Sequence, residues 1–263
     1  MTPLIALMLI AAAHEPGSDA DLGARADARS SSDWSIAVGG GVLSTPSYPG
    51  AASSHVMPMP FFEVQYRHLV FLSPVSGLGI NVVSTQRVQA GVAVQPDLGR
   101  AASSADRLRG WGDVSPGADF RVFGMYSLGR ITLLADVRRQ LGAGNGTLID
   151  GGVTSMLVHA RHLMLSATAT VSWADGRYTR AYFGVDGNQS AEALAQGVRL
   201  PSYSAGAGLR DAALTLVAVV PIDDRWSVQS LVRAEVLLGD AAASPLTERR
   251  VQPTFGGLIA YRL

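Results

Sequence analysis

The sequence predicts an all-β protein, a transmembrane antiparallel up-and-down β-barrel of about twelve strands. Apolar and polar side chains alternate with period two through most of the chain, and no apolar run is long enough for a spanning helix. Period two indicates strands, because successive side chains of a strand point to opposite faces. A closed sheet also pairs every backbone group inside a membrane, which makes a barrel the expected architecture.

Two segments show the alternation most clearly. Between residues 163 and 173, Leu, Ala, Val and Trp share one face, whereas Ser and Thr share the other. Between residues 225 and 238, valines and Trp226 form one face, and Arg, Ser, Gln and Glu form the other. An apolar face toward lipid and a polar face toward a lumen are typical of membrane barrels.

The same pattern divides the rest of the chain into strands. The pieces 68–73 and 78–85 are short, and one bent region in their place would reduce the number to about ten. The predicted strands lie near 34–43, 58–66, 68–73, 78–85, 88–95, 115–126, 130–140, 148–158, 162–173, 204–218, 224–238 and 252–263.

The connections between these strands alternate in length. Short periplasmic turns and long external loops are the rule in outer-membrane barrels, so this alternation supports the prediction independently. The expected short turns are 66–68, 84–87, 127–129, 159–161 and 221–224. The expected external loops are 44–57, 96–114, 141–147, 174–203 and 239–251.

The amino-acid composition excludes several classes of function and site. Only 16% of residues are charged, the 21 basic residues are all Arg, and 21 acids balance them to a net charge of zero. A nucleic-acid partner would require a basic excess, so none is expected. Without cysteine the chain has no disulfides, thiolate metal sites or Cys nucleophiles.

Three regions are predicted along the chain. Residues 1–13 resemble a signal peptide, because an apolar run ends in Ala11-x-Ala13, although no Arg or Lys precedes it. The alternative is a short buried helix. Residues 14–33 are polar and read as a flexible periplasmic leader. Residues 34–263 form the barrel, which we expect in the Gram-negative outer membrane, surrounded by its lipid.

Charged residues on the polar faces are candidates for lining the lumen. One reading is a paired network that fills a narrow barrel, and the other is a set of groups that selects a solute. The candidates are Arg121, Asp136, Arg138, Arg233 and Glu235, with Arg121 and Arg138 expected to pair with Asp136 and Arg233 with Glu235.

Motifs that suggest catalysis have simpler interpretations. His159 and His162 flank a short turn without a third ligand, so no metal site is expected. Residues 142–147 lack the Lys-Ser/Thr ending of a phosphate loop. Asp223 and Asp224 fit the chemistry of a turn. We therefore predict no cofactor and no enzymatic activity, and a barrel hydrolase is the third hypothesis.

Several short motifs, in this order, resemble the MipA/OmpV family of outer-membrane proteins over essentially the whole mature length. The family pattern has an acid directly before the Ser-Pro pair, where this chain has Ala243. The matching pieces are Pro46–Gly50, Pro60–Phe62, Leu78-Gly79, Gly110–Asp113, Tyr182–Val185, Tyr203–Gly208, Gly239-Asp240 and Ser244–Leu246. Of these, Tyr48, Gly50, Tyr182, Phe183, Gly184, Val185, Ser244 and Pro245 are candidate site residues without an assigned role.

The resemblance implies a scaffold rather than an enzyme. The founding member of the family is described as joining a periplasmic lytic transglycosylase to a murein synthase, and other members as porin-like or adhesive. The alternative function is therefore a small-solute channel. If the protein is a scaffold, its expected contact segments are 14–33 and the turn 221–224, while the loop with Tyr182–Val185 folds back onto the barrel mouth.

Overall fold

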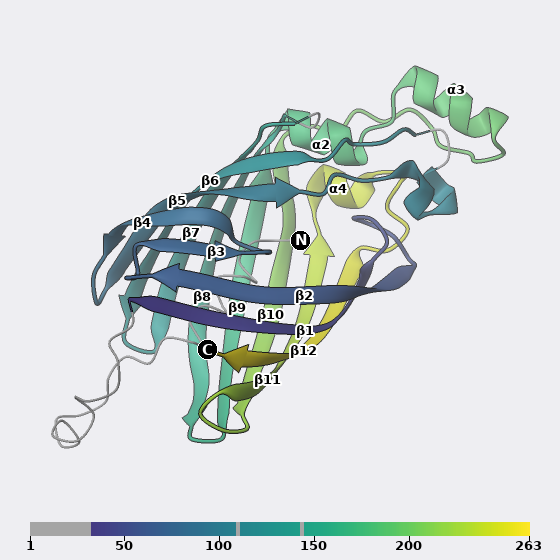
Figure 1. Cartoon of the computed structure of the whole chain (residues 1–263). Helices are drawn as coiled ribbons and strands as arrows, with labels where there is room; N and C mark the ends of the chain where they lie inside the picture. The colour runs from purple at the N-terminus through teal and green to yellow at the C-terminus, as the bar shows by residue number, and fades with distance from the viewer. Residues whose placement is uncertain (1–32, 109–110, 143–144) are drawn as a thin grey trace, which may run out of the picture.

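The computed structural model describes residues 33–108, 111–142 and 145–263 (Figure 1). Twelve antiparallel strands form a closed barrel, in which each strand pairs with its neighbours in sequence and the last strand pairs with the first. The predicted up-and-down barrel is therefore confirmed, with the larger of the two strand numbers. The predicted signal peptide and nearly all of the predicted leader lie outside the described residues.

The observed strands match the predicted ones to within a few residues. They are β1 (Trp34–Pro46), β2 (Ser54–Tyr66), β3 (Val70–Ser73), β4 (Gly77–Ser84), β5 (Val88–Asp97), β6 (Gly117–Leu128), β7 (Ile131–Gln140), β8 (Thr147–Ala160), β9 (Leu163–Ala174), β10 (Gly208–Pro221), β11 (Trp226–Leu237) and β12 (Val251–Arg262).

Several predicted strand starts differ from the observed ones by two to four residues, and two of these differences have a clear local reason. β3 begins at Val70 rather than at residue 68, because Arg67 and His68 form a turn with φ of 46° and 57°. β10 begins at Gly208 rather than at residue 204, because the chain before it belongs to a loop. There Tyr203 makes an isolated β-bridge with Val185.

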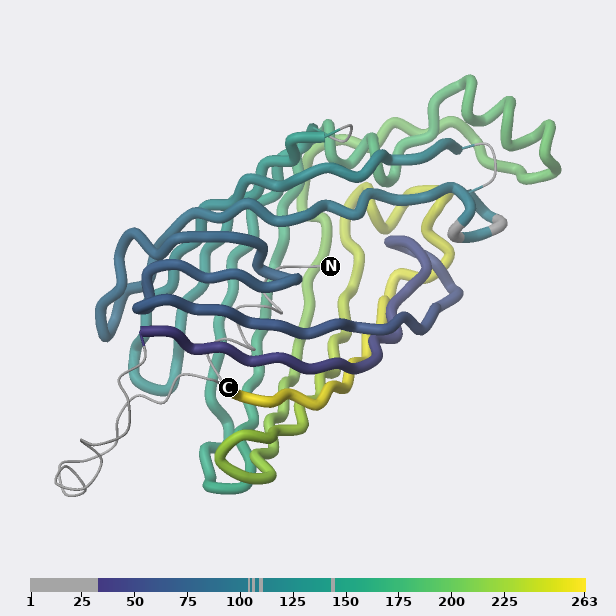
Figure 2. The backbone as a smooth tube through the Cα atoms, in the orientation of Figure 1, coloured from purple at the N-terminus to yellow at the C-terminus, as the bar shows by residue number. Residues whose placement is uncertain are grey.

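The two ends of the barrel differ, as Figure 2 shows. One end, here called the turn end, carries only short connections, such as 129–130 and 161–162. The other, the loop end, carries long segments with short helices that the sequence analysis did not predict. These are η1 (Ala102–Ser104), η2 (Asp106–Leu108), α2 (Gly176–Phe183), α3 (Gly187–Ala195) and α4 (Gly239–Ala243). No helix in the described ranges is long and apolar enough to cross a membrane.

The outer surface of the wall is apolar around the barrel. On β9, Val171 points outward and is 43% exposed, whereas the neighbouring Thr170 points into the lumen and is 6% exposed. Aromatic pairs lie at the turn end, where Trp226 and Tyr261 have ring centroids 4.8 Å apart. Amphipathic rings favour the interface between lipid and water, so this position is typical of a membrane barrel.

Side chains fill much of the lumen in layers. Near the turn end lies an apolar group, here called the turn-end cluster: Phe61, Val217, Val219, Leu231, Leu258 and Ala260. Charged residues follow toward the loop end, and above them the loops and α2 cover the mouth with two further apolar clusters. The candidate site residues lie in these two upper layers.

Candidate functional site: the lumen belt and the loop cap

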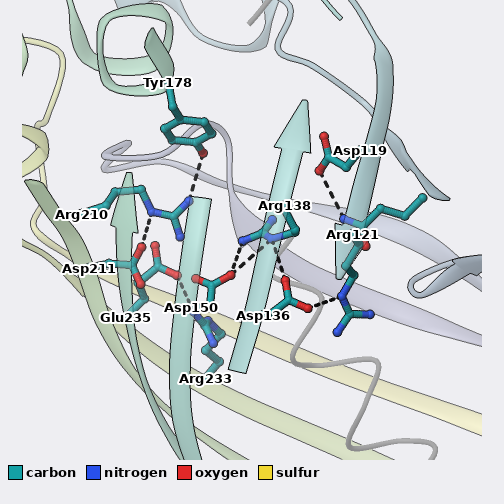
Figure 3. A network of polar contacts seen from close by, with 11 residues as sticks. Asp119, Arg121, Asp136, Arg138, Asp150, Tyr178, Arg210, Asp211, Arg233 and Glu235 are labelled. Carbon is teal, nitrogen blue, oxygen red and sulfur yellow. Dashed lines mark hydrogen bonds and ion pairs between the residues drawn. The ribbon is translucent and has the colours of Figure 1, made fainter. Parts of the chain in front are cut away.

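The charged layer, here called the lumen belt, begins on β6, β7 and β8 (Figure 3). Arg121 donates from its Nε to Asp136. Arg138 lies between two carboxylates, with its Nη2 2.6 Å from Oδ2 of Asp150 and its Nε 3.4 Å from Oδ1 of Asp136. Two arginines and two aspartates on three neighbouring strands therefore form a continuous row of ion pairs.

The lumen belt continues on β10 and β11. Arg210 pairs with the adjacent Asp211, and its Nη1 donates to the Tyr178 hydroxyl at 3.0 Å. Arg233 is paired with Glu235, with Nη2 2.7 Å from Oε2, and it also donates to Thr215 at 3.2 Å. Each arginine of the belt is thus held by a carboxylate.

Burial explains why these charges are paired. Arg121 and Asp211 are 0% exposed, and Arg138 and Asp150 are almost as inaccessible. A buried charge without a partner strongly destabilises the fold. Removal of one member of such a pair therefore lowers the stability of the fold by more than the intact pair raises it. Side chains packed in this way favour the reading of a paired network that fills this side of the lumen.

The predicted lumen residues all point inward, and the predicted pairs of Arg121 and Arg138 with Asp136 and of Arg233 with Glu235 are present. Arg138 makes its shorter contact with Asp150, which the sequence analysis did not select, rather than with Asp136. Arg210 and Asp211 were also missed. A β-bulge between Leu209 and Asp211 places both of them inside, which breaks the period of two that the prediction uses.

The family motifs meet above the lumen belt in a second layer, here called the loop cap. The Tyr48 hydroxyl lies 3.0 Å from the Leu246 carbonyl and 3.2 Å from Oε2 of Glu248, and it donates to one or the other. The Gly50 amide donates to Gln252 at 3.2 Å. The loop after β1 is therefore held against the loop before β12, although they lie at opposite ends of the sequence.

Two further motifs join the loop cap through side chains that donate to buried carbonyls. Ser244 donates from Oγ to the Phe183 carbonyl at 2.6 Å, and Trp111 donates from Nε1 to the Gly184 carbonyl at 2.7 Å. Pro245 accepts from Arg107 at 2.7 Å. These bonds bring together motifs that are far apart in sequence, and none of them requires the acid that Ala243 replaces.

A cation stacks on the aromatic part of the loop cap. The guanidinium carbon of Arg100 lies 3.3 Å from the centre of the Trp111 ring. Desolvation by burial lowers the pKa of Arg100 to about 10, so the side chain remains charged at neutral pH. Arg100 cannot be recognised from the sequence, because a single Arg in a loop gives no periodic signal.

Helix α2 connects the loop cap to the lumen belt. Tyr182 and Phe183 are buried, as is Val185 after the helix, so this tetrad folds back onto the mouth as expected. The rings of Tyr178 and Tyr182 stack with centroids 4.5 Å apart, and Tyr178 accepts the bond from Arg210. Burial raises the pKa of Tyr182, which stays protonated and accepts from Gln140.

The histidine pair and the Asp223 turn, which resemble catalytic motifs in the sequence, have structural explanations. His159 lies near the end of β8 and His162 in the next turn, both exposed. Asp223 Oδ1 accepts the amides of Arg225 and Trp226, which is the chemistry of a tight turn. Its pKa is lowered by those two backbone bonds. Among the described residues no group of three or more His, Asp or Glu could hold a metal ion.

A closed barrel with an apolar exterior, a charged and tightly packed lumen belt and a capped mouth defines a membrane-embedded β-barrel protein. Residues 38–263 match the family described as MltA-interacting protein MipA. The chain belongs to the MipA family, as its motifs indicate. Among curated proteins no significant match is found.

Several solved outer-membrane proteins are similar at low identity. A bacterial polysaccharide outer membrane secretin has a TM-score of 0.46 at 8% identity, with 88% of this chain and 98% of that chain covered. The outer membrane channel DcaP of Acinetobacter baumannii has a TM-score of 0.38 at 7% identity, with 88% and 96% covered. With TM-scores below 0.5, these similarities decide nothing about function.

Proposed function

We propose that the protein is a non-enzymatic scaffold of the Gram-negative outer membrane, which brings a periplasmic lytic transglycosylase together with a murein synthase. Membership of a family named for interaction with MltA supports a murein-hydrolase partner. The apolar outer surface of the wall supports placement in the membrane, with the turn end toward the periplasm.

The observation that carries the proposal is the filled interior. The ion pairs of the lumen belt are buried, and the loop cap covers the mouth with packed apolar side chains. A barrel filled in this way has its working surfaces outside the lumen. A scaffold uses such surfaces, whereas a porin requires a water-filled passage.

The turn end provides the expected contact surface. A cavity of about 470 Å³ opens there, next to the start of β1. Arg67 and Asp33 form an ion pair at its edge with a distance of 2.8 Å. The cavity is lined by Asp33, Ser35, Gln65, Arg67 and His68.

Affinity capture from detergent-solubilised envelopes tests the scaffold. We expect the full chain to retain a lytic transglycosylase and a murein synthase, and deletion of residues 14–33 together with replacement of the turn 221–224 to reduce both. A Tyr182→Phe variant, which keeps the loop cap packed, is the matched control and should capture both enzymes. Undiminished capture after the turn-end changes would contradict the proposed contact surface.

A small-solute channel is the second candidate, supported by the arginines of the lumen belt. Arg121 in particular has Nη1 and Nη2 atoms that are buried without a hydrogen-bond partner among the described residues. Reconstitution in planar bilayers separates the two functions. We expect no stepwise conductance from the wild-type protein, and regular conductance steps would favour the channel.

A further inference from the structure

The wall of the barrel is incomplete on one side. The hairpin β3–β4 is short, and both strands stop well before β2 and β5 do (Figure 1). β2 pairs with β3 only from Val64 to Tyr66, and β4 pairs with β5 only as far as Val94. Among the described residues, 54–63 of β2 and 95–97 of β5 therefore have no strand partner on the sides that face each other. We call this interval the wall gap.

The backbone bonds of β2 show which groups face the wall gap. Ser47 donates to Ser53 at 3.0 Å and Arg67 donates to Asp33 at 2.8 Å. Bonded pairs alternate along an antiparallel ladder, so odd-numbered residues of β2 bond to β1 and even-numbered residues face the other way. Pro58 and Pro60 are even-numbered, and the amide hydrogens that they lack would have pointed into the wall gap.

The opposite edge is built in the same way. Ser127 donates to Arg87 at 2.7 Å, so odd-numbered residues of β5 bond to β6. Thr85 donates to Val88 at 2.8 Å, which places even-numbered residues on the side of β4. Pro96 is even-numbered and lies beyond the last pair with β4, so its nitrogen also faces the wall gap.

Proline at these positions avoids unpaired amide hydrogens at a strand edge inside a bilayer. An unpaired amide hydrogen exposed to the bilayer core is costly, and an open strand edge also invites another strand to add to it. Proline has no amide hydrogen to leave unpaired, which is why it is tolerated at sheet edges. Prolines on both edges indicate that the sequence keeps this interval of the otherwise closed barrel unpaired.

Part of the lumen surface behind the wall gap is apolar, and Glu63, Gln95 and Asp97 also face it. Met57 and Met59 point inward from β2 and are half-buried, and Met59 packs against the turn-end cluster. By contrast, Thr170 on the fully paired far wall is buried. Methionine adapts its shape to irregular apolar ligands.

We propose that the wall gap is a lateral opening, through which an acyl chain of a membrane lipid enters the lumen and lies against Met57 and Met59. Val56 and Leu98, each 70% exposed, give the opening an apolar rim. Pro58, Pro60 and Pro96 remove some of the donors that addition of a strand from a second protein would need, whereas Val56 and Phe62 keep theirs. The proposal rests on the membrane placement proposed above, since only a bilayer presents acyl chains to this surface.

Fluorescence quenching by brominated lipid tests the opening. The chain has no cysteine, so a single introduced cysteine can be labelled specifically. Met59→Cys carries a bimane label and is reconstituted in vesicles of phosphatidylethanolamine and phosphatidylglycerol, with or without brominated acyl chains. Val171→Cys is the outward-facing control. Ser166→Cys is the inward-facing control behind the fully paired wall of β8, β9 and β10. We expect the label at Met59 to be quenched to an extent comparable with Val171, and the label at Ser166 to be quenched little.

The controls separate the two proposals. If the label at Val171 is not quenched, the membrane placement is wrong. If Val171 is quenched while Met59 behaves like Ser166, the membrane placement stands and the lateral opening is overturned. Should Met59→Cys fail to fold, Met57→Cys probes the same space from the next inward position on β2.

Discussion

At the scale of single residues, neighbouring positions on one strand require side chains of different polarity and size. Val171 faces outward from β9, and Thr170, beside it, is packed in the lumen. The sequence shows this alternation but not how tightly the lumen is filled. An arginine at position 170 would be tolerated in a wet lumen, whereas the buried Thr170 leaves no space for one.

Substitution of Val171 tests the assignment of faces. We expect Val171→Arg to lower the stability of the assembled barrel by about 2–4 kcal/mol, because the charge would lie in the bilayer. Val171→Leu keeps the apolar character and should change little. The measurement is the urea midpoint of the heat-modifiable form in vesicles, and equal midpoints for the two variants would mean that this face does not contact lipid.

Ser244 provides a residue-scale test of the loop cap. Ser244→Ala removes the donor to the buried Phe183 carbonyl, so we expect a loss of about 1–3 kcal/mol in the stability of the loop cap. Ser202→Ala, at an exposed loop position, is the control. Limited proteolysis of the loops reports the loss, and identical cleavage of both variants would show that the bond contributes nothing measurable.

At the scale of elements, the strands were predictable and their irregularities were not. The period of two in β9 gives both faces correctly, because outward residues such as Val171 are exposed and inward ones such as Thr170 are buried. In β10 the bulge at Leu209 and Asp211 defeats the same reasoning. Asp150 was missed for another reason: the pattern identifies a face, but the register that sets Asp136 beside Asp150 comes from pairing across strands.

The short helices could have been anticipated from their caps. Asp175 precedes α2 and accepts the amides of Arg177 and Tyr178. Asp186 precedes α3 and forms a capping box with Gln189. Aspartate before a short helix is a recognised start signal. In a long loop, however, Asp also favours turns, so the same residue predicts either structure. The burial of Tyr182 and Phe183 against the barrel mouth stabilises the helix.

The cap of α2 predicts a dependence on pH. Burial raises the pKa of Asp175, but hydrogen bonds from the amides of Tyr178, Thr147 and Arg177 outweigh this and lower it below its ordinary value of 3.8. A carboxylate with a lowered folded-state pKa stabilises the fold fully above its ordinary pKa, and that contribution is lost as the pH falls through the folded value.

We therefore expect the start of α2 to become less protected below about pH 4, where an ordinary aspartate titrates. The measurement is hydrogen exchange at the amides of Arg177 and Tyr178, corrected for the intrinsic effect of pH. Asp175→Asn keeps a capping oxygen without the charge, so its protection should change less with pH. A wild-type protein whose protection is the same at pH 7 and pH 3 would contradict the role of the carboxylate.

At the scale of the whole molecule, a closed sheet predicts a particular behaviour in detergent. We expect the mature chain to give a far-UV spectrum dominated by β-structure and to migrate faster before heating than after it, because the closed barrel stays compact until it melts. A spectrum dominated by helix, or migration unaffected by heating, would be incompatible with the barrel.

The contact between Tyr48 and Leu246 also has a consequence for assembly. These residues are separated by 198 positions, and they lie above the seam where β12 meets β1. Bringing the two ends of so long a chain together carries the largest loss of chain entropy of any strand pairing here, so the seam is the expected last step of folding. The bond from Tyr48 forms after that step, and the loop cap therefore stabilises the barrel once the seam between β12 and β1 has closed.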